Sequence, residues 1–233
     1  MTDHRPGTPA ATRILAEFAA GLRYDAIPRP VIDHIKLTTL DGLGCCLYGA
    51  TLPWTRMVAD VVMRDGGRTE ATVIGTDRRA PVAGAVLVNA TAGHAFELDD
   101  IHRDSILHPN SIAVPTALAF AERAGGASGQ DVLAAIVAGY EVSTRVGLGS
   151  GTDLLLRGFH PQGVLGSICA AVTAAHMLRL DADRMHHAIG IAASLGAGLM
   201  AAQEGAMVKR LHSGRAAEAG VRAAELAADG FTG

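Results

Sequence analysis

Ionisable side chains are concentrated in one short stretch of an otherwise apolar chain. FELDDIHRDSILHPNS, residues 96–111, lies between segments of Ala, Val, Leu and Gly and contains Glu97, Asp99, Asp100, His102, Arg103, Asp104 and His108. Neighbouring carboxylates and imidazoles are the groups that most often carry general acid–base catalysis. The stretch therefore predicts a proton-transfer site, and the alternative is a solvated connection between two apolar helices.

Two histidines of the chain directly precede a proline at the predicted start of an apolar helix. They are His108 before Pro109 and His160 before Pro161. Proline favours the first position of a helix, where free amide groups and the helix dipole attract anions. The pattern is typical of a site that binds a carboxylate and moves a proton.

A third polar segment supplies the positive charge that a polyanionic substrate needs. GAMVKRLHSGR, residues 205–215, places Lys209, Arg210 and His212 after a Gly-rich segment and before the last predicted helix. We expect these side chains to bind substrate carboxylates.

Each of these signals has an ordinary structural interpretation. A histidine before a proline usually belongs to a loop or a helix cap. The pair Asp99 and Asp100 is typical of a solvated helix end, and Lys209 with Arg210 is typical of a surface pair. Only their coincidence in so apolar a chain favours a functional site.

Metal-ligand spacing is weak in this sequence. His102, Asp104 and His108 could form a group of ligands, but no pair of histidines at i, i+4 supports it, so we predict no metal site. The cysteines, two adjacent (Cys45 and Cys46) and one distant (Cys169), suit neither a disulfide framework nor an iron–sulfur cluster. A reducing, cytoplasmic compartment is the expectation.

The elements that must position these groups are predicted to be helices. Apolar residues recur at helical spacing, and Ser128 with Asp131 forms a capping-box pattern before the segment 132–147. TEATVIG, residues 69–75, is the one good strand candidate. The predicted helical segments are 11–22, 31–50, 82–98, 111–126, 132–147, 157–180, 182–194 and 215–230. Continuation of the third helix through HAFELDD would place His94 and Glu97 on one face.

Composition supports a single all-α domain over residues 1–233. Hydrophobic residues make up 49% of the chain and charged ones 18%, and 28 glycines allow helices to pack closely. So apolar a surface predicts association with a partner chain. The net charge of −3 and scattered cations indicate no nucleic-acid partner. No membrane partner is expected, because no apolar run reaches roughly 18 residues without charge.

Several of these motifs, in their order along the chain, resemble those of the MmgE/PrpD family. The resemblance rests on DGLGCCLYGA, HAFELDDIHRDSILHP, GYEVSTRVG, GFHPQGVLGSICAAV and GAMVKRLHSGRAAEAGVRAAELAADGFTG. That family includes 2-methylcitrate dehydratases, cis-aconitate decarboxylases and an iminodisuccinate epimerase. The resemblance implies a large helical domain, a smaller α+β lid domain, a homodimer and chemistry without a metal or organic cofactor.

The family's active-site pattern carries over to four positions of this chain. They are Glu97, His108, His160 and Lys209, which the resemblance implies are catalytic. The polar neighbours that match the same motifs are expected to bind substrate: Asp100, His102, Arg210 and His212.

The chain departs from the family pattern in two substitutions and in length. Ile101 stands where decarboxylase-like members tend to carry Thr, and Asn110 where Gly or Ser is common, which argues against decarboxylation. Family members are about twice as long, so we expect a chain that stops where the lid domain would begin. The predicted function is a cofactor-independent lyase or isomerase of a small di- or tricarboxylate, resembling 2-methylcitrate dehydratase or iminodisuccinate epimerase. The alternative is a non-catalytic helical fragment that serves in dimerisation.

Overall fold

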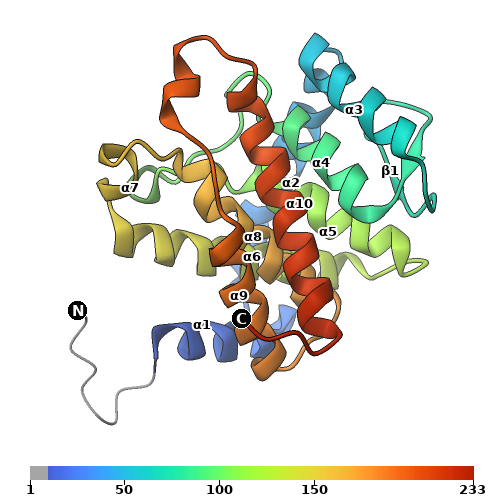
Figure 1. Ribbon diagram of the computed structural model, residues 1–233. Helices are drawn as coiled ribbons and strands as arrows, with labels where there is room; N and C mark the ends of the chain where they lie inside the picture. Colours follow the sequence, from blue (N-terminus) through green and yellow to red (C-terminus); the bar gives the residue numbers. More distant parts are fainter. Residues whose placement is uncertain (1–9) are drawn as a thin grey trace.

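Residues 10–233 are described by a computed structural model, in which α-helices account for most of the chain (Figure 1). The α-helices are α1 (Ala11–Gly21), α2 (Arg29–Gly49), α3 (Pro53–Asp65), α4 (Val82–Gly93), α5 (Asn110–Arg123), α6 (Gly129–Ser150), α7 (Asp153–Leu156), α8 (Pro161–Met177), α9 (Ala182–Leu195) and α10 (Val208–Ala228). Short 3-10 helices are η1 (Tyr24–Ala26), η2 (Arg103–Ser105) and η3 (Met200–Glu204). The all-α prediction is confirmed for the described residues; the predicted domain start at Met1 lies outside them.

Helix starts follow the local sequence signals. The Ser128 hydroxyl accepts a hydrogen bond from the Asp131 amide at 3.1 Å, and the Asp181 carboxylate accepts one from the Arg184 amide at 2.9 Å. These bonds satisfy amide groups that have no partner within the helix. Pro53 and Pro161 each occupy the first position of a helix, where a missing N–H costs nothing.

The core is built from helices that carry small side chains. α10 crosses the front of the domain in Figure 1 and packs against α8, α4 and α9. Gly220 of α10 shows how close the contact with α8 is, because a Cβ atom there would lie 2.4 Å from the Ser167 carbonyl oxygen. Close packing of this kind fixes the relative positions of the helix ends.

Three local predictions differ from the structure. α4 ends at Gly93, and Glu97 has a φ of 61°, so HAFELDD is not helical and reaches its partners as a loop. The predicted strand is reduced to Ala71–Thr72 (β1), paired with Arg79–Ala80 (β2). α10 begins at Val208, so the cationic segment is the first turns of that helix, not a loop before it.

α6 is the described helix whose length and hydropathy would suffice to cross a bilayer, which the sequence-based search for apolar runs did not detect. Within its most apolar window, 56% of the residues are buried inside the domain. It packs against α8 and α5. These contacts are those of a core helix.

Candidate active site

Gln162 ties together the starts of three helices. This fully buried side chain accepts a hydrogen bond from the His108 amide at 2.9 Å and donates to the His108 carbonyl oxygen at 3.1 Å. Its amide nitrogen also lies 3.1 Å from the hydroxyls of Ser111 on α5 and Ser213 on α10. The N-terminal ends of α5, α8 and α10 therefore meet, and their dipoles favour an anion at one place.

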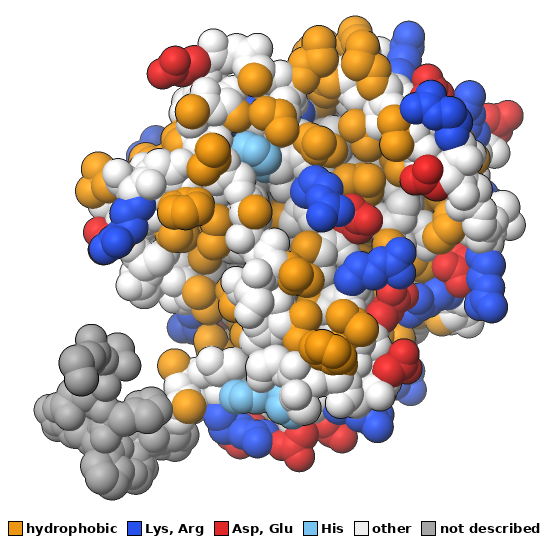
Figure 2. All heavy atoms as spheres, viewed as in Figure 1, with side chains coloured by type: hydrophobic (Ala, Val, Ile, Leu, Met, Phe, Trp, Pro, Cys, Tyr) orange, Lys and Arg blue, Asp and Glu red, His pale blue; other side chains and the backbone are white. Residues whose placement is uncertain are grey.

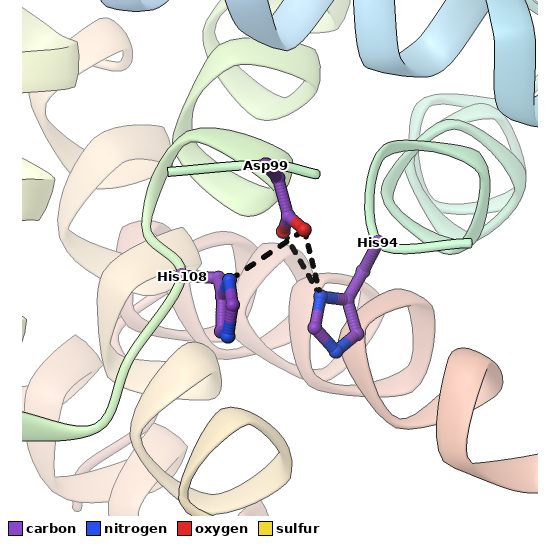
Figure 3. A group of neighbouring side chains, drawn as sticks. All are labelled: His94, Asp99 and His108. Carbon is purple, nitrogen blue, oxygen red and sulfur yellow. Dashed lines mark hydrogen bonds and ion pairs between the residues drawn. The ribbon is translucent and has the colours of Figure 1, made fainter. Parts of the chain in front are cut away.

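Asp99 holds two imidazoles beside these helix ends (Figure 3). Its carboxylate lies 2.9 Å from Nδ1 of His94 and 3.5 Å from Nδ1 of His108. The Asp99 side chain is fully buried. The rings of His94 and His108 meet edge to face, with centroids 4.7 Å apart.

His160 and His212 form a second pair of imidazoles. Their Nδ1 atoms lie 2.9 Å apart, and the His160 ring centroid lies 6.0 Å from that of His94. Gly198 allows this packing, because a Cβ atom there would lie 3.1 Å from the His212 ring and its φ is 139°. Four imidazoles thus form a continuous group that runs from His108 through His94 and His160 to His212.

Glu97 joins the group to the positive charges of α10. Its carboxylate forms an ion pair with Lys209 and lies 2.8 Å from the guanidinium of Arg210. The same carboxylate lies 3.9 Å from Nε2 of His94. Glu97 occupies a left-handed backbone conformation that non-glycine residues rarely adopt, and such outliers gather at functional sites.

The surroundings move the histidine pKa values in opposite directions. Burial, together with His94, His212 and Lys209, lowers the pKa of His160 to about 3. Burial and the nearby His94 and Lys209 also lower the pKa of His212. Burial lowers the pKa of His108 as well, but Asp99 outweighs it and raises the pKa above its ordinary value. One imidazole is therefore kept neutral while another is held toward its protonated form.

The acidic groups are kept ionised by their partners. Burial raises the pKa of Glu97, but the hydrogen bond and charge of Lys209, with the charge of Arg210, bring it down to about 2. Burial likewise raises the pKa of Asp99, and the facing imidazoles of His108 and His94 lower it well below its usual range. Both carboxylates are therefore acceptors at neutral pH.

Six of the eight predicted site residues belong to this group, and the other two lie outside it. Glu97, His108, His160 and Lys209 converge as predicted. Asp100 lies behind the site, where it accepts hydrogen bonds from the Tyr140 hydroxyl at 2.7 Å and the Asn110 amide at 3.0 Å.

Of the other residues predicted to bind substrate, two belong to the histidine group and one does not. Arg210 and His212 belong to the group through Glu97 and His160. Within residues 10–233, His102 makes no hydrogen bond to the histidine group. Its Nδ1 atom is instead hydrogen-bonded to the hydroxyl of Ser105 at 2.9 Å. Whether each residue binds substrate stays a prediction.

Two ordinary interpretations of the sequence are wrong. Asp99 is 5% exposed and lies inside the site, so the acidic pair is not a solvated helix end. Lys209 is 8% exposed and pairs with Glu97, so it does not belong to a surface pair. Tertiary contacts across more than a hundred residues produce this burial, and no local pattern reports them.

The sequence-based prediction of catalytic residues missed His94 and Asp99. His94 follows a run of twelve residues in α4 with no charge, which is the signal that an ionisable group there must be paired or functional. Among the described residues, His94, Asp99 and His108 are also the set whose possible metal-ligating atoms lie within 4.8 Å of one another. The alternative grouping of His102, Asp104 and His108, which the sequence did not favour as a metal site, is not such a set.

Cavities elsewhere in the domain do not coincide with this chemistry. One of about 910 Å³ lies between the end of α1, the start of α6 and the end of α8, and its lining includes Tyr24, Ser128 and His176. The histidine group is instead open toward the surface at Glu97. The cavity is also lined by ionisable residues, but it contains a single histidine, so the candidate site is placed at the histidine group. Those residues are Arg23, Asp25, Asp131, His176 and Arg179.

Comparisons with known proteins give the family of this chain. The sequence model of the MmgE/PrpD N-terminal domain matches residues 13–233. A cis-aconitate decarboxylase-like protein of Aspergillus oryzae is 38% identical over 240 residues, which cover 100% of this chain and 50% of that protein. A cis-aconitate decarboxylase of Aspergillus terreus is 35% identical, with 99% of this chain and 49% of the relative covered.

The human cis-aconitate decarboxylase is 31% identical over 95% of this chain and 47% of its own length. The chain therefore spans about half the length of the curated relatives it matches. The family match covers nearly all of the chain, and the all-α architecture and the ordered motifs agree with it. This chain belongs to the MmgE/PrpD family.

Proposed function

We propose that this chain supplies the histidine site of a cofactor-independent lyase that acts on a small tricarboxylate of the cis-aconitate type. The observation that carries the proposal is the meeting of four imidazoles and Lys209 at the N-terminal ends of three helices. Such a place attracts a polyanion and offers groups that exchange protons near neutral pH. The names of the relatives support the substrate class.

The two histidines of the predicted acid–base pair receive different roles. His160 is neutral at physiological pH, because burial and its neighbours lower its pKa to about 3, and it acts as the base. His108 acts as the acid, since Asp99 raises its pKa. A buried carboxylate behind an imidazole is a common way to stabilise the protonated ring.

Positive charge for the substrate comes from α10. Lys209 and Arg210 bind a carboxylate and stabilise the negative charge that develops on the reacting carbon. Both cations contact Glu97. The substrate carboxylate must therefore compete with Glu97 or displace it.

Decarboxylation is the reaction that the relatives favour. The bond between a carboxylate carbon and its neighbour breaks, carbon dioxide leaves, and the electron pair stays on the neighbouring carbon until His108 delivers a proton there. The lack of a hydroxyl at Ile101 and Asn110 pointed instead to dehydration or epimerisation. The relatives' names outweigh that argument, and 2-methylcitrate dehydration and iminodisuccinate epimerisation remain the other candidate reactions.

The site needs a cover to exclude water. Large apolar side chains that are exposed flank its residues in the sequence: Leu98, Ile101, Phe159, Leu199, Met207 and Val208. A rim of this kind suits a protein segment or partner chain that closes over the substrate. The chain spans about half the length of the relatives it matches, and residues like those of the other half are candidates for this cover.

The test is an enzyme assay of the purified full-length protein. Each of cis-aconitate, 2-methylcitrate and iminodisuccinate is added, and the products are followed by NMR. Turnover of cis-aconitate with release of carbon dioxide supports the proposal. Turnover of another substrate redirects the reaction, and no turnover of any supports the alternative of a helical dimerisation fragment.

A further inference from the structure

We propose that His94 is a further proton-transferring residue of this site and that Asp99 is the positioning residue that orients it. The inference rests on the proposed function. It extends that function to a residue outside the predicted set of Glu97, His108, His160 and Lys209.

Asp99 fixes which nitrogen of His94 carries a proton. The two oxygens of its carboxylate lie 2.9 and 3.2 Å from Nδ1 of His94. The Asp99 side chain is fully buried, and an ionised carboxylate only accepts hydrogen bonds. Nδ1 of His94 therefore donates, and in the neutral ring the lone pair is at Nε2.

That lone pair is buried and has no hydrogen-bond partner among the described residues. The His94 side chain is 1% exposed, and Nε2 makes no hydrogen bond. The nearest charged atom is an oxygen of Glu97 at 3.9 Å, beyond hydrogen-bond distance. Leaving a buried polar atom without a hydrogen bond is destabilising, so its presence needs an explanation such as a bound substrate.

The position of His94 places Nε2 inside the histidine group. Its ring lies between those of His108 and His160, with centroid distances of 4.7 and 6.0 Å. The backbone of His94 continues from α4, where its amide donates to the Ala90 carbonyl oxygen. A ring held by a helix end and by Asp99 is fixed well enough to act on a bound substrate.

The chemistry is a reversible proton transfer. In the proposed decarboxylation, Nε2 of His94 takes up a proton from solvent, and the electron pair on the carbon that carbon dioxide has left takes that proton to form a C–H bond. In the candidate dehydration or epimerisation, Nε2 instead removes the proton of a substrate C–H bond, whose electron pair stays on the substrate. The resulting imidazolium is paired with the Asp99 carboxylate and later returns the proton. No oxidant, reductant or further co-reactant is needed.

Ionisable groups from several elements face His94. From the loop after α4 these are Glu97 and Asp99, and from the segment before α5 it is His108. His160, at the start of α8, is another of these groups, and α10 contributes the rest: Lys209, Arg210 and His212. Any pH profile must therefore be compared between variants, not read from one protein.

A first experiment measures the proton positions directly in this chain. Nitrogen-15 NMR of the histidine rings gives the protonated nitrogen of each imidazole. We expect His94 to be protonated at Nδ1, and we expect its Nε2 resonance to move when cis-aconitate is added. Protonation at Nε2, or an Nε2 resonance whose chemical shift does not change when the tricarboxylate is added, overturns the inference. This readout does not require turnover.

A second experiment measures turnover in the full-length protein. His94→Asn keeps a donor near Asp99 and removes Nε2, and Asp99→Asn keeps the size of the side chain and removes its charge. We expect each variant to lower kcat by roughly 10²–10⁴-fold, with KM changed less than about threefold, because a proton-transfer group acts in the transition state. His187→Asn on α9 is the matched control.

The pH profile separates a positioning role from a structural one. Asp99→Asn should move the pH dependence of kcat, since the charge that supports two imidazoles is lost. A loss of activity that matches the loss of folded protein, with an unmoved profile, overturns the role of Asp99. Wild-type protein without any turnover counts against the proposed function, whereas the NMR result still decides the role of His94.

Discussion

Nδ1 of His160 lies 2.9 Å from Nδ1 of His212, so one proton is shared between two buried imidazoles. One ring donates and the other accepts, and both cannot carry a proton on these atoms at once. Burial is the main reason why the pKa values of both residues fall, and the charges of His94 and Lys209 lower them further. This lowering keeps a neutral imidazole available as a base in a site that also contains Lys209.

Acid should therefore destabilise the domain in a pH range set by this pair. His160 and His212 are neutral in the folded state, whereas in the unfolded chain each has an ordinary pKa near 6.5. Unfolding therefore takes up protons below pH 6.5. The free energy of unfolding should fall by up to about 1.4 kcal/mol per pH unit for each of the two residues. Urea unfolding between pH 7.5 and 4.5 measures this slope.

His176, whose pKa is also lowered by burial, adds to this slope, whereas the following groups act outside this window or with the opposite sign. His108, whose pKa is raised, contributes stability that is complete below pH 6.5 and is lost at higher pH. Glu97, with a pKa of about 2, contributes stability that is lost as the pH falls below about 4.5. His160→Asn should reduce the slope between pH 6.5 and 4.5, and an unchanged slope in this variant contradicts the explanation.

Removing the base should affect turnover much more than folding. In the full-length protein, we expect His160→Ala to lower kcat by roughly 10²–10⁴-fold, the usual scale for a general base. The melting temperature should change little, because the ring lies at the start of α8 and makes its recorded side-chain hydrogen bond to His212 alone. Steady-state kinetics and thermal unfolding of the same preparation check both expectations.

Glu97 should limit how tightly the substrate binds. Since its carboxylate contacts Lys209 and Arg210, Glu97→Gln removes a competitor for these cations. We expect the variant to bind a non-reacting tricarboxylate severalfold more tightly and yet to turn over more slowly. Calorimetric titration gives the dissociation constant of the tricarboxylate, and steady-state kinetics give kcat.

Lys209→Ala is the matched comparison for this prediction. It removes a cation from the same ion pair, and we expect it to raise KM and weaken binding. Equal weakening by Glu97→Gln and Lys209→Ala would mean that the ion pair only supports the local fold.

The fold was largely predictable from the sequence because its signals are local. Capping at Ser128 and Asp181 and proline at Pro161 give helix starts that the structure confirms. The end of α4 was not predictable in this way, since the residues that follow Gly93 are drawn out of the helix by contacts with distant side chains. The interaction of Glu97 with Lys209 spans 112 positions.

Local sequence signals identified site residues only where a proline marked a helix start, and the family resemblance added Glu97, Lys209 and their neighbours. His108 and His160 are identified by the prolines that follow them, and both lie in the group. His94 and Asp99 carry no such local mark, and their importance depends on a buried contact between them. The sequence shows which side chains can move protons, and tertiary packing decides which nitrogen faces the substrate.

Gly163 should be intolerant of a side chain although it lies within a helix. A Cβ atom there would lie 2.1 Å from the Ala197 carbonyl oxygen, so the segment that packs on His212 must move. We expect Gly163→Ala to lower the free energy of unfolding by about 1–3 kcal/mol. Gly44→Ala in α2, with nothing within 4 Å, should raise it by up to about 1 kcal/mol. Similar effects of both substitutions on urea unfolding would contradict the close contact.

Exposed apolar residues make association the expected state of this domain. Acidic and basic side chains gather mainly along the right and lower margins of the face in Figure 2, and hydrophobic side chains appear across much of the rest. On α2, Leu37, Leu40 and Leu47 are 67%, 68% and 54% exposed, and their spacing of three and seven residues places them on one side of the helix. A stripe of this kind is typical of a surface that a partner covers.

We therefore predict that the chain forms a dimer through α2, and that a charge in the stripe separates the subunits. Light scattering at micromolar concentration should give a mass near twice that of the 24.0 kDa chain. Leu40→Glu should reduce it to the single-chain value without lowering the melting temperature of the domain, because Leu40 contributes little to the core. Leu156→Glu is the control, since Leu156 on α7 is 80% exposed and lies outside the stripe. A monomeric wild-type chain, or dissociation by Leu156→Glu but not by Leu40→Glu, would show that α2 is not the contact surface.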